Sequence, residues 1–384
     1  MLGAGVYVVF GPAAKYAGSA LPIAVVIAGL MAYLNAGSIA QLAKIVTRSG
    51  GAYSYARHYL SPAWGFLAGL AFLIGKLGSV AAIALTFANY LVPQFAMPVA
   101  IAAILIMTLV NVWGINRTAF GAKVLASITI SFLTVVILAA AFSDVQGEAL
   151  SAASPASVLT ASALLFFAFA GYARVATLGG EVRDPERTIP KAIAISLGIV
   201  FVLYLSLSLV LPAKLGMSLA SSITPIADLV DQIVPGVDGQ SVAIFAAIAA
   251  LGSLLALLAG MSRTAATMAE DGELPAALAR LNSRGVPFIA EWLVALLAIV
   301  LVTTDSVEFV IGLSSFAVLL YYAIANLAAI RQPKSDSRRS KVLSSAGLAI
   351  CLVVGLFVPP ASLVLGFTII FLIVFLRWGL AKLR

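Results

Sequence analysis

The chain has 384 residues, of which 62% are hydrophobic and 10% are charged, and its formal net charge is +8. Soluble domains are nearer half apolar and a quarter charged, so this composition excludes an ordinary soluble protein and predicts an integral membrane protein. One cysteine, Cys351, and one histidine, His58, exclude an intrachain disulfide and a Cys/His zinc site. No catalytic constellation is visible either, so we expect neither an enzyme nor a bound cofactor.

Apolar runs long enough to cross a membrane as helices recur along the chain. A helix needs about twenty apolar residues to cross the hydrocarbon core. Such runs predict eleven spans, near residues 20–43, 63–91, 98–115, 121–142, 157–179, 190–212, 241–262, 287–304, 307–330, 342–358 and 361–378. Residues 1–10 are also apolar but cover only about half a span. The sequence therefore predicts an all-α polytopic membrane protein.

Lys and Arg residues are unevenly distributed between alternate loops. Of the 23, all but four fall in one set of alternate loops and chain ends. The exceptions are Lys15 and Lys214 in the opposite loops, and Lys76 and Arg174 inside predicted spans. Because positive residues stay cytoplasmic, we expect a multi-pass protein of the cell membrane with a cytoplasmic C-terminus. This distribution explains the positive charge without a nucleic-acid partner.

Two glycine-containing segments, centred on Gly5 and Gly171, lie at comparable places five spans apart. Glycine favours non-helical backbone, and interrupted helices at matching positions of two halves point to the binding site of a transporter. An unwound stretch frees N–H and C=O groups, which can hold a carboxylate, an ammonium group or a cation. The alternative interpretation is that these glycines only allow close helix packing.

Three sequence blocks outside the spans strengthen the transporter interpretation. The first is RSGGAYSY at 48–55, continued by SPAWGF at 61–66. The second is GEVRDPERTIPKA at 180–192, and the third is SR at 262–263 followed by MAEDGELP at 268–275. In this order and spacing, the blocks resemble the amino acid–polyamine–organocation (APC) superfamily of permeases. The resemblance covers nearly the whole chain, and the second block is its most specific part.

The resemblance implies a five-plus-five inverted-repeat (LeuT-type) transporter fold with two extra C-terminal helices. Residues 1–142 would form the first repeat, with helices 1b to 5, and residues 143–330 the second, with helices 6 to 10. Residues 331–384 would supply a cytoplasmic linker and helices 11 and 12. The implied activity is secondary-active amino acid transport by alternating access around the first and sixth helices.

The resemblance also implies a binding site at the two interrupted helices. The α-carboxylate of the substrate would meet N–H groups of the first break, and its α-ammonium group would meet carbonyl groups of the second. An aromatic ring at the position of Phe167 often stacks over the substrate in such permeases. The implied substrate-binding residues are Gly3, Ala4, Gly5, Phe167, Ala168, Phe169 and Gly171.

The chain departs from the family pattern in three places. Family members have a cytoplasmic half-helix before the glycine motif, whereas here the motif stands at the start, so we expect that half to be absent or the start to be misassigned. Many relatives carry a Glu where this chain has Ala173. Some proton-coupled relatives carry a fifth-helix Lys where this chain has Thr129.

Lys76 and Arg174 are unusual because an ionisable residue inside a membrane is costly and by default functional. Lys76 could carry a coupling proton in place of the missing fifth-helix Lys, or it could pair structurally. Arg174 could contact an anionic substrate group, or it could reach backbone carbonyls in the vestibule. Carboxylates lie in loops or near span ends, with Glu291 and Glu308 nearest to a span interior. This charge inventory favours a substrate with a carboxylate and disfavours polyamines.

We therefore predict a secondary-active amino acid permease whose partners are a small amino acid, a coupling proton and membrane lipid. Sodium coupling and substrate exchange stay open, and Ser253 either lines a sodium position or bonds to its own helix. Two alternatives are a membrane sensor or scaffold that does not transport, and an inactive truncated permease. A membrane-embedded enzyme lacks an acid–base or metal constellation.

Overall fold

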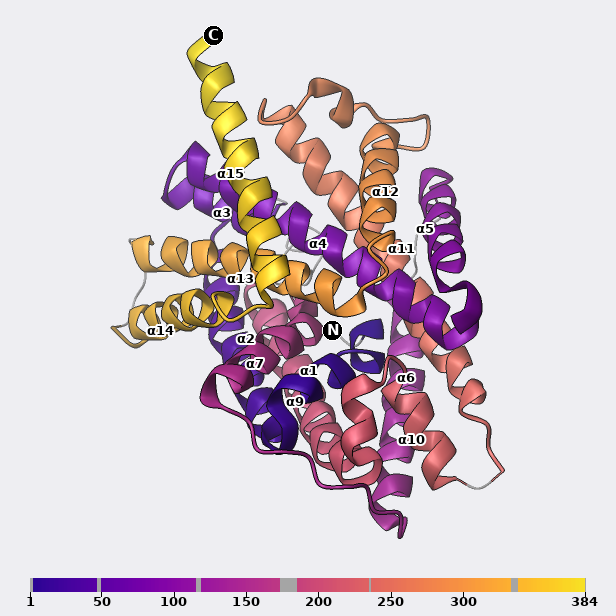
Figure 1. The fold of residues 1–384 in the computed structure, drawn as a ribbon. Helices are drawn as coiled ribbons and strands as arrows, with labels where there is room; N and C mark the ends of the chain where they lie inside the picture. Colours follow the sequence, from indigo (N-terminus) through magenta and orange to yellow (C-terminus); the bar gives the residue numbers. More distant parts are fainter. Residues whose placement is uncertain are drawn as a thin grey trace.

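Figure 1 shows the computed structural model of the chain, which describes residues 3–46, 50–114, 119–172, 185–234, 236–332 and 338–383. Within these ranges the chain forms α-helices and short 3₁₀-helices, and no strand. Their order places two short helices, α1 (Phe10–Ala17) and α3 (Ala52–Tyr59), before and after the long helix α2 (Leu21–Ala43). The predicted all-α class is confirmed for the described part of the chain.

Nine segments of the described chain are long and apolar enough to cross a membrane. They are Phe10–Ala43, Pro62–Leu91, Pro93–Val112, Val124–Phe142, Pro155–Tyr172, Pro190–Ser221, Gly239–Glu270, Val307–Arg331 and Pro360–Arg377. The first of these contains both α1 and α2, which Gly18 separates with a φ of 51°. The chain is thus a multi-pass membrane protein.

Two of the eleven predicted spans do not qualify, although both are helical. Helix α12 (Phe288–Val302) has 15 residues. At 1.5 Å per residue it covers about 22 Å, less than the hydrocarbon core of about 30 Å. Helix α14 (Arg338–Gly355) begins with three basic residues within four positions, which lower its mean hydropathy. The prediction of eleven spans is therefore reduced to nine candidates among the described residues.

Local sequence explains where several spans begin. Helix α4 (Pro62–Leu91) starts with proline in its first turn, and Ser61 Oγ accepts a hydrogen bond from the N–H of Trp64. Helix α7 (Pro155–Phe169) repeats this arrangement, since Ser154 Oγ accepts from the N–H of Ser157 at 3.2 Å. The N–H groups of the first helical turn have no acceptor within the helix, so proline, which lacks an N–H, is tolerated there. The serine side chain accepts a hydrogen bond from one of the remaining N–H groups.

Helix α4 crosses the middle of the molecule in Figure 1 and packs mainly against α13 (Val307–Arg331) and α11 (Val242–Glu270). Glycine permits the close approach of α4 to α13. A Cβ on Gly78 would lie 2.7 Å from the carbonyl oxygen of Val310, closer than such atoms pack. Beside this contact, the hydroxyls of Ser79 and Ser314 form a buried hydrogen bond of 2.9 Å. Small residues with a hydroxyl bond are a common way to join helices in membranes.

Two polar ties hold opposite ends of this core. At the start of α13, Glu308 accepts hydrogen bonds from Lys15 Nζ at 2.8 Å and from the Tyr16 hydroxyl at 2.6 Å, which joins α1 to α13. At the other end, Glu273 forms ion pairs with Arg57 of α3 at 2.7 Å and with Arg377 of α15 (Pro360–Leu383) at 2.9 Å. We name these the α1–α13 tie and the Glu273 tie.

Tyr53 of α3 belongs to the same end as the Glu273 tie. Its hydroxyl donates to Asp271 Oδ2 at 2.7 Å, and the guanidinium group of Arg57 lies 5.7 Å from its ring centroid. Burial, followed by the bond to Asp271, raises the pKa of Tyr53 above its ordinary value, so the phenol stays neutral and keeps donating. Helix α3 is therefore held on the bundle by both charge and hydrogen bonds.

Candidate functional site

The first interruption is a 3₁₀-helix, η1 (Ala4–Tyr7), which is fully buried. It ends at Tyr7, the next residue Val8 has a φ of −131°, and α-helical backbone begins at Phe10. The carbonyl oxygen of Gly5 accepts from the N–H groups of Val8 at 3.3 Å and Val9 at 3.0 Å. The first N–H groups of a helix have no acceptor within that helix, so those of η1 are available to a ligand.

The second interruption is at the end of α7. The α-helix stops at Phe169 and is followed by a 3₁₀-helix, η4 (Ala170–Tyr172). The N–H of Ala170 donates to the carbonyl oxygens of Phe166 and Phe167. The chain beyond Tyr172, which includes the predicted position Arg174, lies outside the described residues up to Pro185. The described chain therefore has 3₁₀ geometry at both expected segments, before α1 and after α7.

The two interruptions touch each other. A Cβ built on Gly5 would lie 3.1 Å from Cε1 of Phe167 and 3.2 Å from Cα of Ala168. Phe167 keeps 9% of its surface exposed and Ala168 keeps 6%, whereas Phe169 keeps none. Residues more than 160 positions apart thus meet with no side chain between them. The Phe167 ring occupies the space beside Gly5, so a ligand there requires the ring or one break to move.

Ser253 of α11 lies against the start of η1. Its Oγ is 2.7 Å from the place where a Cβ of Gly3 would stand, and the same oxygen donates to the carbonyl of Ala249 at 2.7 Å. The expected bond to its own helix is thus observed, and the sodium position stays a prediction. The serine also presents an oxygen to the first break.

Tyr204 of α9 (Pro185–Leu215) contacts both breaks and was not identified from the sequence. Its hydroxyl donates to the carbonyl oxygen of Ala168 at 3.3 Å. Its ring meets those of Phe169 and Phe10 edge to face, with centroids 4.9 Å and 6.0 Å away. One carbonyl predicted to hold the substrate thus already has a protein donor, although a carbonyl oxygen can accept twice. A tyrosine inside an apolar span was the only available signal.

Tyr90 of α4 forms the corresponding hydrogen bond at the first break. Its hydroxyl donates to the carbonyl oxygen of Tyr7 at 2.6 Å and accepts from the N–H of Ile226 at 3.3 Å. Ile226 lies in the first turn of α10 (Pro225–Ile233), so Tyr90 joins η1 to a short helix between spans. The sequence did not identify Tyr90 either.

We predict that Tyr90→Phe lowers the melting temperature of the purified protein. The change leaves the carbonyl of Tyr7 and the N–H of Ile226 without this buried partner, which costs about 1–3 kcal/mol. Tyr33→Phe is the matched control, because Tyr33 is 57% exposed. Equal melting temperatures for the Tyr90 variant and the unmodified protein would show that the bond does not hold η1.

Lys76 lies in α4 and is buried, with 7% of its surface exposed. One turn before it, Phe72 packs against the ring of Tyr321, with centroids 5.5 Å apart. Tyr321 contacts Tyr322 at 5.2 Å, and Tyr322 stacks on Tyr172 at 5.1 Å. A continuous chain of aromatic rings therefore connects the α4 turn next to Lys76 with the second break.

One carboxyl group is more buried than its position near a span end suggested. Glu291, in the first turn of α12, has no exposed surface, and its Oε1 accepts from Asn111 Nδ2 at 2.7 Å. Asn111 also donates to the carbonyl oxygen of Leu255 in α11 at 3.0 Å. The charge inventory of the protein interior thus includes a carboxyl group, held between α5 (Ala96–Val112), α11 and α12.

Two 3₁₀ segments that meet inside a helical membrane bundle resemble the binding region of a secondary transporter. The sequence matches the family model described as "Amino acid permease" over residues 1–379, and the chain belongs to this family. The predicted resemblance is confirmed. Members of the family are transporters and not enzymes, as expected.

Three relatives illustrate the range of the family. An uncharacterized transporter of Mycobacterium tuberculosis is 42% identical over 374 residues, which is 95% of this chain and 84% of that protein. "Cationic amino acid transporter 7, chloroplastic" of Arabidopsis thaliana is 29% identical over 56% of this chain and 43% of its own length. The branched-chain amino acid permease BcaP of Bacillus subtilis is 22% identical over 88% of this chain and 80% of its own length. The substrates named for the last two relatives differ, so membership of the family alone does not name a substrate.

Proposed function

We propose that this protein is a secondary-active amino acid permease that binds its substrate between the two helix breaks. The contact of Gly5 with Phe167 and Ala168 carries this proposal, because it unites N–H groups of one break with carbonyl groups of the other. An α-amino acid has the complementary pair of charges. The α-carboxylate would face Gly3, Ala4 and Gly5, and the α-ammonium group would face carbonyls of the Phe167–Phe169 segment beside Gly171.

Alternating access would follow from the two polar ties. Glu308 of the α1–α13 tie lies at the start of α13. Arg57 of the Glu273 tie lies against Gly65 near the start of α4. Because α4 and α13 run antiparallel, with Phe72 beside Tyr321 and Gly78 beside Val310, the start of α4 lies towards the end of α13, so the two ties are at opposite ends. We propose that they open in turn as the breaks separate. In the arrangement seen here both ties are closed, and the Phe167 ring fills the space next to Gly5.

We further propose that residues 1–142 and 143–330 are the two inverted repeats, with 331–384 as linker and trailing helices. The position of one break at the start of each part supports this division. An experimental structure should superpose the two parts after a rotation of about 180° around an axis in the membrane plane. Parallel repeats would contradict it. The basic loops favour a cytoplasmic C-terminus.

Proton coupling through Lys76 is the proposed energy source, supported by its burial in a span. Sodium coupling is the second candidate, because Ser253 Oγ stands beside Gly3 at the first break. Uptake into proteoliposomes with either a pH gradient or a sodium gradient separates the two. Accumulation that follows only sodium would reject the proton, and uptake of label only into proteoliposomes preloaded with unlabelled substrate would indicate exchange.

We predict a ranking of ligands in a binding survey of the purified full chain. Neutral or acidic amino acids should bind with the highest affinity, arginine and lysine with lower affinity, and putrescine and spermidine with the lowest. A carboxylate meets the N–H groups of η1, whereas a purely cationic ligand leaves these N–H groups without a partner. Thermal shift with each compound measures the ranking, with amino acid amides as controls that lack the carboxylate. Tight binding of putrescine without binding of any α-amino acid would overturn the proposed substrate class.

A sensor or scaffold that binds the same ligands without moving them is distinguished by the uptake assay. Radiolabelled substrate should accumulate in proteoliposomes and should exchange with unlabelled substrate on the other side. A ligand that shifts the melting temperature while neither activity is detectable would favour the sensor. Binding and transport are therefore tested separately.

A further inference from the structure

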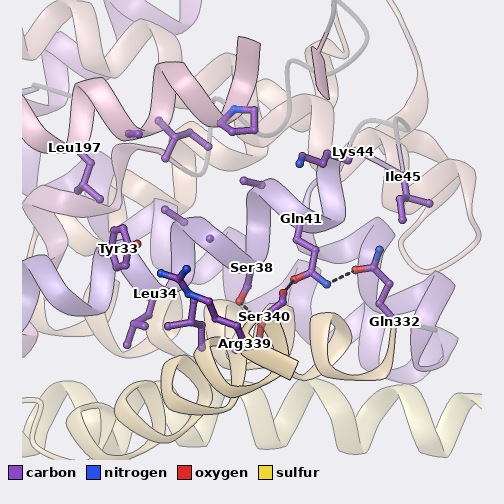
Figure 2. A pocket seen from close by; sticks show the side chains of 18 residues that line it. Tyr33, Leu34, Ser38, Gln41, Lys44, Ile45, Leu197, Gln332, Arg339 and Ser340 are labelled. Atoms are coloured by element: carbon purple, nitrogen blue, oxygen red, sulfur yellow. Dashed lines mark hydrogen bonds between the residues drawn. The ribbon is translucent and has the colours of Figure 1, made fainter. Parts of the chain in front are cut away.

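A groove of about 540 Å³ opens between α2, α9 and α14, away from the two breaks. Part of its wall is apolar and includes Leu34 of α2, Ile193 and Leu197 of α9, and Leu343 of α14. Figure 2 shows these helices around the groove, with Leu34 and Leu197 on its apolar part. An apolar wall on the outside of a membrane bundle fits an acyl chain.

Two cations line the groove, and Figure 2 draws the Arg339 guanidinium group on the side of Tyr33 and Leu34, away from Lys44. Lys44 follows the last residue of α2, and Arg339 is the second residue of α14. Both side chains are exposed and both line the groove, as Figure 2 shows. Neither Asp nor Glu occurs among the described residues that line it. The local charge is therefore positive and suits an anionic group.

The place of these cations along the helices matches the depth of a lipid headgroup. Helix α2 ends beside Lys44, α14 begins beside Arg339, and Pro190 near the start of α9 lines the same groove. Three helix ends thus meet where a span leaves the hydrocarbon core. Basic pockets between transmembrane helices at this level bind acidic lipid headgroups.

The other polar side chains of the groove already bond to each other. Ser38 and Ser344 share a hydrogen bond of 2.9 Å, and Gln41 Nε2 donates to Gln332 Oε1 at 2.7 Å. Ser340 donates to the other side of the Gln41 amide, as Figure 2 shows. The two serine bonds join α14 to α2, and Gln332, which follows α13, joins the end of that helix to α2, so hydrogen bonds fix the walls of the groove. They leave Lys44 and Arg339 as its charged groups.

We propose that this groove binds one acidic phospholipid, with its headgroup attracted by the charges of Lys44 and Arg339 and an acyl chain along the apolar wall. The site is separate from the two breaks and does not depend on which solute is transported. Charge complementarity selects the acidic headgroup, and the apolar wall selects a lipid over a free anion. The occupant would sit between α2 and α9 on one side and α14 on the other.

The test measures lipid binding to the delipidated full chain by native mass spectrometry. Phosphatidylglycerol should remain bound at one copy per chain, and phosphatidylcholine should not. The double variant Lys44→Gln/Arg339→Gln should lose about 30-fold in affinity, since each basic residue contributes about 1 kcal/mol. Arg280→Gln/Arg284→Gln is the matched control, because it removes the same charge from exposed positions outside the groove and should keep the lipid.

Gly37→Phe supplies an independent test with both cations in place. Gly37 lines the groove, and a Cβ there would meet nothing within 4 Å. The added ring should fill the groove and displace the lipid without lowering the melting temperature, since glycine within a helix is itself unfavourable. The proposal is overturned if the control pair loses the lipid equally, if Gly37→Phe binds it undiminished, or if inorganic phosphate in excess displaces it.

Discussion

Gly5→Val should reduce amino acid uptake about 5- to 150-fold relative to the unmodified protein, while the chain still folds. The Cβ alone would stand 3.1 Å from the Phe167 ring and 3.2 Å from the backbone of Ala168, and valine adds two further carbons. Overpacking of this kind costs about 1–3 kcal/mol, which is about 5- to 150-fold in an equilibrium constant. The cost falls on the closed contact of the two breaks seen here, to which the proposed transport cycle must return.

Gly198→Val is the matched control for this variant. Gly198 lies in α9, and a Cβ there would meet nothing within 4 Å, so the same substitution in a membrane helix should leave uptake nearly unchanged. Size-exclusion chromatography and the melting temperature establish folding for both proteins. Normal uptake by Gly5→Val would show that the substrate does not bind at this contact, whatever its chemistry.

Lys76→Met should abolish accumulation driven by a pH gradient and should impair exchange of substrate across the membrane much less. If Lys76 carries the coupling proton, net accumulation requires the empty carrier to return with that group in its other protonation state. Exchange returns with substrate bound and needs no such change. Methionine keeps most of the length of the side chain, so packing in α4 is preserved. Both rates are measured in the same proteoliposomes.

Lys214→Met controls for the loss of a buried lysine. Lys214 is also 7% exposed, but its Nζ donates to the backbone carbonyls of Ser143 at 2.7 Å and Val145 at 3.0 Å, outside the two breaks. This variant should lower stability and leave the ratio of accumulation to exchange unchanged. Equal loss of accumulation and exchange in a folded Lys76→Met protein would assign Lys76 to structure or substrate binding.

The sequence by itself determined the class of the protein, most of its spans and its family. Hydropathy over a span length is a local property, so nine of the expected spans recur as apolar helices of the described chain. The breaks at Gly5 and after Phe169 were also predictable, since glycine acts on the backbone where it stands. The family match covers residues 1–379 and so includes the second sequence block, of which 180–184 lie outside the described residues.

Only the tertiary structure decided which residues meet. Gly5 touches Phe167, Tyr90 reaches the carbonyl of Tyr7, and Tyr204 reaches that of Ala168. No local sequence pattern predicts the hydrogen bonds of these tyrosines, because a tyrosine within an apolar span cannot be distinguished by sequence from an aromatic residue that only packs. The groove between α2, α9 and α14 likewise depends on three helix ends that are distant in sequence. Hydropathy and glycine act along the chain, whereas contacts between helices follow from how whole side-chain surfaces pack.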